Sequence, residues 1–279
     1  MRCPENVVFL HGVPRSGTSW LAQILNSSPS VAFRFQPLFS YAFKDRLNSE
    51  SSRSDVNSFL QQVFLTSDQF ILQKERVLDG SYPSFRKLLP ATHLAVKHVR
   101  YHNLLEHLLH VHSGIRLVLM LRHPCSVINS WLRAPREFLP EWNPLTEWRF
   151  AEKKNCGRPE EFFGFEKWKE ASRLFIRLAS NYPERVKLVR YSRLNSDTQD
   201  TVAELFRFCG LEMTDQTQGF LNVSRSVENS DTYSVFRKNN SDVKWKTQLE
   251  KEIAEAILND LKGSDLEFLL EQPSESLDR

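Results

Sequence analysis

The chain has 279 residues, of which 41% are hydrophobic and 25% charged, an ordinary composition for a globular protein. Its composition excludes collagen-like and disordered classes, and no apolar run approaches the roughly 18 residues that cross a membrane. The formal net charge of +3 is too small to indicate nucleic-acid binding by itself. The four cysteines are widely spaced and the N-terminus resembles no signal peptide, so we expect a cytoplasmic protein with reduced thiols.

Short apolar runs alternate with amphipathic stretches along the chain. Residues 7–11 predict a buried strand, the loop GVPRSG follows, and residues 18–26 have the spacing of a helix that Pro29 ends. The segment 33–92 is less regular, apart from an amphipathic stretch near 55–66. The later predicted strands are 93–99, 115–121 and 185–191, and the later predicted helices are 101–112, 125–132, 160–181, 198–210 and 247–262. A Trp- and Pro-rich loop is expected at about 134–149, and an irregular stretch ends near 244.

Strands that alternate with helices predict an α/β fold with a mainly parallel central sheet flanked by helices. Ligands of such sheets bind at the carboxyl ends of the strands. The loops after residues 11, 98, 122 and 191 are therefore expected to surround one crevice. No internal repeat or linker divides the chain, so a single domain over 1–279 is predicted, with a polar, frayed tail at about 270–279.

The loop after the first predicted strand has the glycine spacing of a phosphate-binding loop. In GVPRSGTS, Gly12 and Gly17 are followed by Thr18 and Ser19, where a nucleoside triphosphatase has Lys and then Ser or Thr. Backbone N–H groups and the helix N-terminus still form an anion site, and Arg15 is the cation of the loop. The missing Lys normally holds the β- and γ-phosphates, which weakens a kinase interpretation. An ordinary surface turn before a helix is the alternative.

Four segments in order resemble the sulfotransferases that use 3′-phosphoadenosine-5′-phosphosulfate (PAPS). VPRSGTSW resembles the 5′-phosphosulfate loop of that family, and LVLMLRHPCSVINSWL resembles its 3′-phosphate segment. RVKLVRYSRL with the later LFRFCGL resembles a family strand with Tyr and the helix after it. FRKNNSDVKWKTQL resembles the late Arg-Lys-Gly loop. The matches run from residue 13 to about 249, so the resemblance covers most of the chain.

The resemblance implies a P-loop-like fold with PAPS as donor and 3′-phosphoadenosine-5′-phosphate (PAP) as product. Arg15 would contact the transferred sulfonate, because a guanidinium can hold two oxygens at once. Trp20 would stack on the adenine, with a place in the core of the first helix as the alternative. The residues that would hold the 5′-phosphate through their backbone are Ser16, Gly17, Thr18 and Ser19.

The later segments imply the rest of the donor site. Arg122 and Ser130 would bind the 3′-phosphate, and Tyr191 is similar to an adenine-side Tyr of the family. Arg237 and Lys238 would close over the 3′-phosphate, although Asn stands after them in place of the usual Gly. No metal ligand is expected, since a sulfonate carries less charge than a phosphoryl group.

The catalytic base is sought in LAVKHVRYH, which resembles a family strand that ends in Lys-x-His. Here His98 follows Lys97 directly, one position early, which in a regular strand places it on the opposite face. We predict His98 as the base because a strand end can bulge, and His102, Asp45 and Asp79 are the alternatives.

The resemblance implies in-line transfer of the sulfonate to a hydroxyl or amine of a small-molecule or carbohydrate acceptor. Arg15 and the segment Phe35-Gln36-Pro37 favour the carbohydrate-modifying or bacterial members, where a Glu stands in place of Gln36. An ATP-dependent kinase on a degenerate P-loop is one alternative function. A non-catalytic nucleotide-binding or protein-interaction module is the other.

Overall fold

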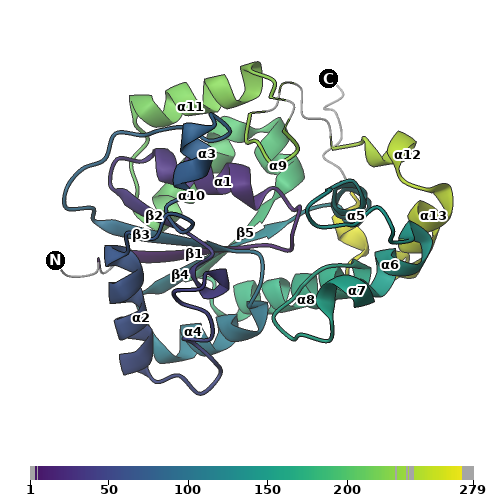
Figure 1. Ribbon diagram of the computed structural model, residues 1–279, viewed down its shortest axis with the longest axis horizontal. Helices are drawn as coiled ribbons and strands as arrows, with labels where there is room; N and C mark the ends of the chain where they lie inside the picture. The colour runs from purple at the N-terminus through teal and green to yellow at the C-terminus, as the bar shows by residue number, and fades with distance from the viewer. Residues whose placement is uncertain (1–3, 5, 230, 237, 239–241, 272–279) are drawn as a thin grey trace.

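The computed structural model describes residues 4, 6–229, 231–236, 238 and 242–271, and most of the predicted tail lies outside them. Its centre is a five-stranded sheet in which each pair of neighbouring strands is parallel (Figure 1). The strands are β1 (Asn6–His11), β2 (Val31–Phe35), β3 (His93–His98), β4 (Ile115–Leu121) and β5 (Val186–Arg190), in the order β2-β3-β1-β4-β5. The predicted α/β fold is thereby confirmed.

Each face of the sheet is buried under helices, which is why the strands are apolar at successive positions. Successive side chains of β1 point to opposite faces of the sheet. Val7 and Phe9 therefore belong to the core on one face, and Val8 and Leu10 to the core on the other. Figure 1 shows the helices that cover the core of Val8 and Leu10 above the sheet, and the helices that cover the core of Val7 and Phe9 below it. The upper helices are α1 (Thr18–Ser27), α9 (Tyr191–Ser196), α10 (Thr198–Cys209) and α11 (Asp215–Ser226), and the lower ones are α2 (Arg53–Leu65), α4 (Leu105–Val111) and α8 (Phe165–Asn181).

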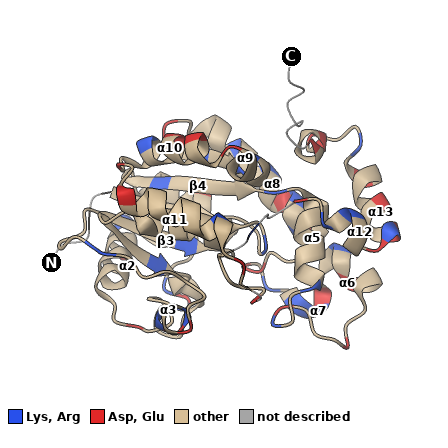
Figure 2. Cartoon of the chain, turned by 90° about the horizontal axis from the view of Figure 1, so that it is seen from above, with Lys and Arg blue, Asp and Glu red and all other residues tan. Residues whose placement is uncertain are grey.

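A group of short helices lies beyond the carboxyl end of β4 (Figure 2). They are α5 (Pro124–Leu132), α6 (Pro144–Phe150), α7 (Glu152–Asn155), α12 (Trp245–Gln248) and α13 (Lys251–Leu261). The remaining elements are α3 (Lys74–Leu78) and the 3-10 turns at Pro37–Phe39, His102–Leu104 and Glu267–Leu270. The short helices therefore frame the end of the sheet at which ligands of parallel α/β proteins bind.

The structure differs from the sequence-based expectation in several elements. Strand β2 and helices α6, α9 and α11 lie in segments that showed no clear pattern. Strand β2 is only five residues long and contains Arg34, whose Nε donates to the carbonyl of Val63 at 2.8 Å. Helix α8 begins five residues later than predicted, because Gly164 stands before it at a positive φ of 88°. Helix α10 does end at Gly210, as predicted.

None of the helices in the described ranges is long and apolar enough to span a membrane. Cys125, Cys156 and Cys209 are free thiols, and Cys3 lies outside the described residues.

Candidate functional site

The loop between β1 and α1 forms a tight anion-binding turn. The Ser16 hydroxyl and backbone N–H both donate to the carbonyl of Val13, at 2.7 and 3.2 Å, so Ser16 is buried beneath the loop. Arg15 adopts a left-handed conformation with a φ of 69°, and Gly17 follows with a φ of 94°. Helix α1 begins at Thr18, and the N–H groups of its first turn point out of the helix toward the loop.

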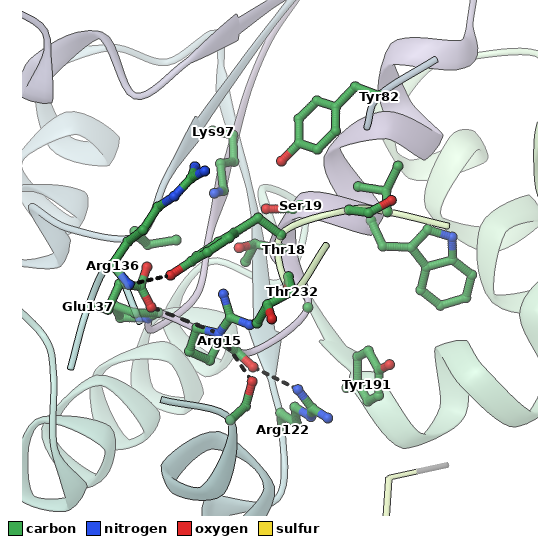
Figure 3. A pocket seen from close by; sticks show the side chains of 18 of the residues that line it. Arg15, Thr18, Ser19, Tyr82, Lys97, Arg122, Arg136, Glu137, Tyr191 and Thr232 are labelled. Atoms are coloured by element: carbon green, nitrogen blue, oxygen red, sulfur yellow. Dashed lines mark hydrogen bonds and ion pairs between the residues drawn. The ribbon is translucent and has the colours of Figure 1, made fainter. Parts of the chain in front are cut away.

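A cavity of about 930 Å³ opens above this loop at the carboxyl ends of the strands (Figure 3). Among the described residues that line it, ten are Lys or Arg and three are Asp or Glu. This excess of positive charge suits anionic ligands. The cavity brings together most of the predicted donor site, namely Arg15, Gly17, Thr18, Ser19, Trp20, Arg122, Ser130 and Tyr191.

Arg15 and Arg122 are linked within the cavity. Nη1 of Arg122 donates to the carbonyl of Arg15 at 2.8 Å, and Nε of Arg15 donates to the Ser130 hydroxyl at 3.1 Å. Nη2 of Arg15 donates to the carbonyl of Thr232 at 3.2 Å. Asp242 forms an ion pair with Arg122 at 2.7 Å. The two guanidinium groups are therefore held in fixed positions by the protein itself.

Two aromatic side chains flank these arginines. The Tyr191 ring is buried, and its centroid lies 4.3 Å from the Arg122 guanidinium. Trp20 meets Tyr191 edge to face at 6.5 Å and donates from Nε1 to the Ser224 hydroxyl at 3.1 Å. Trp20 is only partly buried and faces the cavity, so its side chain does not lie wholly in the core beneath α1.

The structure corrects the prediction of His98 as catalytic base. His98 shares the face of β3 that carries Leu94 and Val96, so its ring is fully buried in the core instead of lining the cavity. Neither ring nitrogen has a hydrogen-bond partner among the residues that the structure describes. Burial, with smaller contributions from His11 and Lys97, lowers its pKa well below the ordinary value. Strand β3 ends without the bulge that would have turned His98 to the other face.

The alternative bases also lie elsewhere. His102 is fully buried, with its Nδ1 3.0 Å from Nδ1 of His11. Asp45 and Asp79 are exposed and do not belong to the described residues that line the cavity. Gln36 does line it and accepts from Nη1 of Arg100 at 3.4 Å.

Of the last two predicted donor residues, the structure describes only Lys238. Lys238 is exposed, its backbone N–H donates to Glu228 at 2.8 Å, and it is not among the described residues that line the cavity. Arg237 lies outside the described residues. The predicted closure over the 3′-phosphate stays a prediction.

Two cavity residues, Lys97 and Glu137, were not predicted. Lys97 is 4% exposed and occupies the face of β3 opposite His98, toward the phosphate loop. Burial lowers its pKa to about 7, nearby Arg100 and Arg15 act in the same direction, and Glu137 opposes them. Lys97 and Val99 both line the cavity. Because side chains alternate between the two faces of a strand, the sequence already indicated that His98, between them, points away from the cavity.

Glu137 lies in the turn after α5, beside the phosphate loop. Its Oε2 is 3.9 Å from Nε of Arg15 and has no hydrogen-bond partner among the described residues. No sequence motif marks this residue, because it reaches the loop only through the fold.

A parallel α/β sheet with an anion-binding loop at its centre defines a class of proteins that bind phosphate or sulfate groups. The chain belongs to the sulfotransferase family, whose sequence model matches residues 7–215. No curated protein sequence matches the chain closely enough to count as a relative.

Solved sulfotransferase structures share the fold. A mouse sulfotransferase (SULT7A1) complexed with PAP has a TM-score of 0.57 at 15% identity, over 97% of this chain and 90% of the other. A retinol dehydratase in complex with retinol and PAP gives 0.53 at 14% identity, over 95% and 84%. The sulfotransferase domain from the curacin biosynthetic pathway gives 0.50 at 18% identity, over 94% and 99%. At these identities the likeness shows the fold alone.

Proposed function

We propose that the chain transfers the sulfonate of PAPS to a hydroxyl or amine of a small-molecule or carbohydrate acceptor and releases PAP. The observation that carries this proposal is the linked pair of Arg15 and Arg122 in a basic cavity above the phosphate loop. The similar mouse sulfotransferase and retinol dehydratase were both crystallised with PAP, which supports the same nucleotide for this chain.

The donor would be bound by charge and by stacking. Arg122 offers a charge-assisted contact to the 3′-phosphate, and Tyr191 and Trp20 supply aromatic surface for the adenine. The first turn of α1 binds the 5′-phosphate through its N–H groups. Asp242 holds Arg122 in this structure, so a bound phosphate must replace that carboxylate.

Arg15 and Glu137 would act on the reacting atoms. Arg15 neutralises the sulfonate oxygens as charge moves toward the leaving phosphate. Glu137 Oε2 takes the proton of the acceptor, the acceptor lone pair forms the new bond to sulfur, and the bond from sulfur to the 5′-phosphate breaks with its electron pair on PAP. The carboxylate fits this role because its Oε2 is buried without a hydrogen-bond partner among the described residues, 3.9 Å from Nε of Arg15.

Calorimetric titration with PAP, and with ATP–Mg²⁺ as the comparison, tests the donor. We expect PAP to bind and ATP–Mg²⁺ to bind at least tenfold more weakly, since ATP has no 3′-phosphate for Arg122. A preference for ATP–Mg²⁺ would support a kinase instead, and binding of neither would support an interaction module.

Substitution of Glu137 tests the base. Glu137→Gln keeps the shape of the side chain, and we expect turnover with PAPS to fall about 100-fold or more while PAP affinity is maintained. Glu141→Gln is the matched control, because Glu141 is exposed in the same segment between α5 and α6 and does not line the cavity in the described structure. Equal turnover of both variants would assign the proton to another group, with Lys97 the next to test.

A further inference from the structure

Three basic side chains gather at the end of the cavity next to β2 and β3, each against an aromatic ring. All three line the cavity, and we call them the basic cluster. They are Lys97 over Phe35, Arg100 over Phe39 and Lys154 over Phe163, at 4.7, 4.0 and 5.0 Å between the charged group and the ring centroid.

The positive charge of this cluster is only partly balanced by the protein. Arg100 has its own ion pair with Glu161, at 2.7 Å. Lys97 and Lys154 have neither an ion pair nor a side-chain hydrogen bond among the residues that the structure describes. Glu137 attracts both ammonium groups from a greater distance, while it lies within ion-pair distance of Arg15. Burial lowers the pKa of Lys97 to about 7 and also lowers that of the half-buried Lys154, so an anion from outside would stabilise the charged form of both side chains.

The order of the strands places this cluster on the side of the phosphate loop opposite Arg122 and Tyr191. The phosphate loop follows β1 in the middle of the sheet, and Arg122 and Tyr191 follow β4 and β5 on one side of it. Lys97 ends β3 on the other side, in register with Phe35 of β2. The phosphates of the donor therefore have their own cations, and the basic cluster remains for the second substrate.

We propose that the acceptor is itself an anion, a hydroxyl-bearing sugar or aromatic carboxylate whose carboxylate is bound by Lys97 and Lys154. This inference rests on the proposed sulfonate transfer. Phe35, Phe39 and Phe70 pack together on the same wall, with centroid distances of 5.3 and 6.2 Å to Phe70. They line the cavity and supply aromatic surface for the ring of such an acceptor.

Glu137 is compatible with an anionic acceptor because the Glu137 carboxylate and the acceptor carboxylate would lie at different ends of the cavity. The acceptor carboxylate would lie against the lysines, and the hydroxyl would lie at the Arg15 end of the cavity, where Glu137 Oε2 is available. An acceptor that carries both groups on one ring spans this separation, whereas a simple neutral alcohol leaves the two lysines uncompensated.

Matched pairs of ligands test this inference. Binding to the PAP-saturated full chain is measured calorimetrically for p-nitrophenyl β-D-glucuronide against the β-D-glucoside, and for 4-hydroxybenzoate against 4-hydroxybenzamide. Each pair differs by one carboxylate. We expect the carboxylate to bind at least tenfold more tightly in at least one pair, and turnover with PAPS, where it occurs, to show the same preference.

Variants then locate the effect. Lys97→Met and Lys154→Met keep the apolar stem and remove the charge, so each is expected to reduce the carboxylate preference about threefold or more and to leave binding of the neutral partner unchanged. Lys153→Met is the matched control, since Lys153 is exposed on the same helix α7 and does not line the cavity in the described structure.

Three results would overturn the inference. Equal or weaker binding of the carboxylate in both pairs, with PAP bound normally, refutes the anionic acceptor and leaves the proposed function intact. A carboxylate preference that survives in both lysine variants refutes the assigned site. Failure of PAP to bind the unaltered chain refutes the proposed function and the inference together.

Discussion

The substitution Gly17→Ala tests whether the phosphate loop has the strained, closely packed geometry seen in the structure. Gly17 has a φ of 94°, and an added Cβ would lie 2.5 Å from Cδ2 of Tyr191. The backbone conformation alone costs a non-glycine residue about 1–3 kcal/mol. The Tyr191 ring is buried and lies against the Arg122 guanidinium, so relief of the contact costs about 1–3 kcal/mol more. We therefore expect the free energy of unfolding to fall by about 2–6 kcal/mol.

Urea unfolding of matched variants measures this loss. Gly219→Ala is the control, because Gly219 lies in α11 without a positive φ, and a Cβ added there would meet no neighbouring side chain of the described structure within 4 Å. It is expected to be stabilising, by up to about 1 kcal/mol. The same Gly17→Ala change in a Tyr191→Ala background, which removes the ring atoms that the new Cβ would meet, should lose only the backbone part, which a double-mutant cycle isolates. A loss below about 0.5 kcal/mol for Gly17→Ala would refute the assigned geometry.

Three further outcomes are expected. Arg122→Met should weaken PAP binding about 30-fold or more in calorimetry and hardly affect the 3′-dephosphorylated analogue, and equal losses would place the 3′-phosphate elsewhere. His98→Leu should keep kcat within about threefold, and a tenfold loss in a folded variant would restore His98 as the base. Burial, and to a smaller extent Lys97, lowers the pKa of His11 from 6.5 to about 3. Between these two pH values the imidazole takes up a proton in the unfolded chain and stays neutral in the folded protein. The free energy of unfolding should therefore fall by about 2 kcal/mol for this group between pH 6.5 and pH 5, and a smaller loss in the His11→Phe variant checks the source.

The sequence could predict that the residues of the proposed donor site lie together at one cavity, because they are encoded locally. Gly12, Arg15 and Gly17 lie within six residues, and Arg122 and Ser130 lie directly after β4 and in the helix that follows it. The chemistry of such a site depends on backbone N–H groups and helix ends, which a short motif determines. The fold followed from the same regularity, since buried parallel strands are continuous apolar runs.

The proposed acceptor half could not be predicted because distant segments form it. Glu137 comes from the turn after α5 and Lys154 from α7, a helix of four residues with no pattern of its own. The orientation of His98 and Lys97 is a different case, because the alternation of side chains along the strand already indicated which of the two faces the cavity. Leu94 and Val96 are core residues, which places His98 with them and Lys97 on the loop side. The family resemblance suggested a histidine two positions after Lys97, where this strand has Val99 facing the cavity and His98 turned into the core.

The contacts of the two donor-site arginines imply a link between donor binding and the base. Glu137 lies within ion-pair distance of Arg15, and Asp242 is paired with Arg122, so each guanidinium already has a carboxylate neighbour. Under the proposed function, a sulfonate at Arg15 would compete with Glu137 for the same guanidinium and would free the carboxylate to contact the acceptor hydroxyl. Glu137→Gln should therefore bind PAPS at least as tightly as the unaltered chain while turning it over more slowly. A variant that lost donor affinity and turnover in equal measure would show instead that Glu137 only positions Arg15.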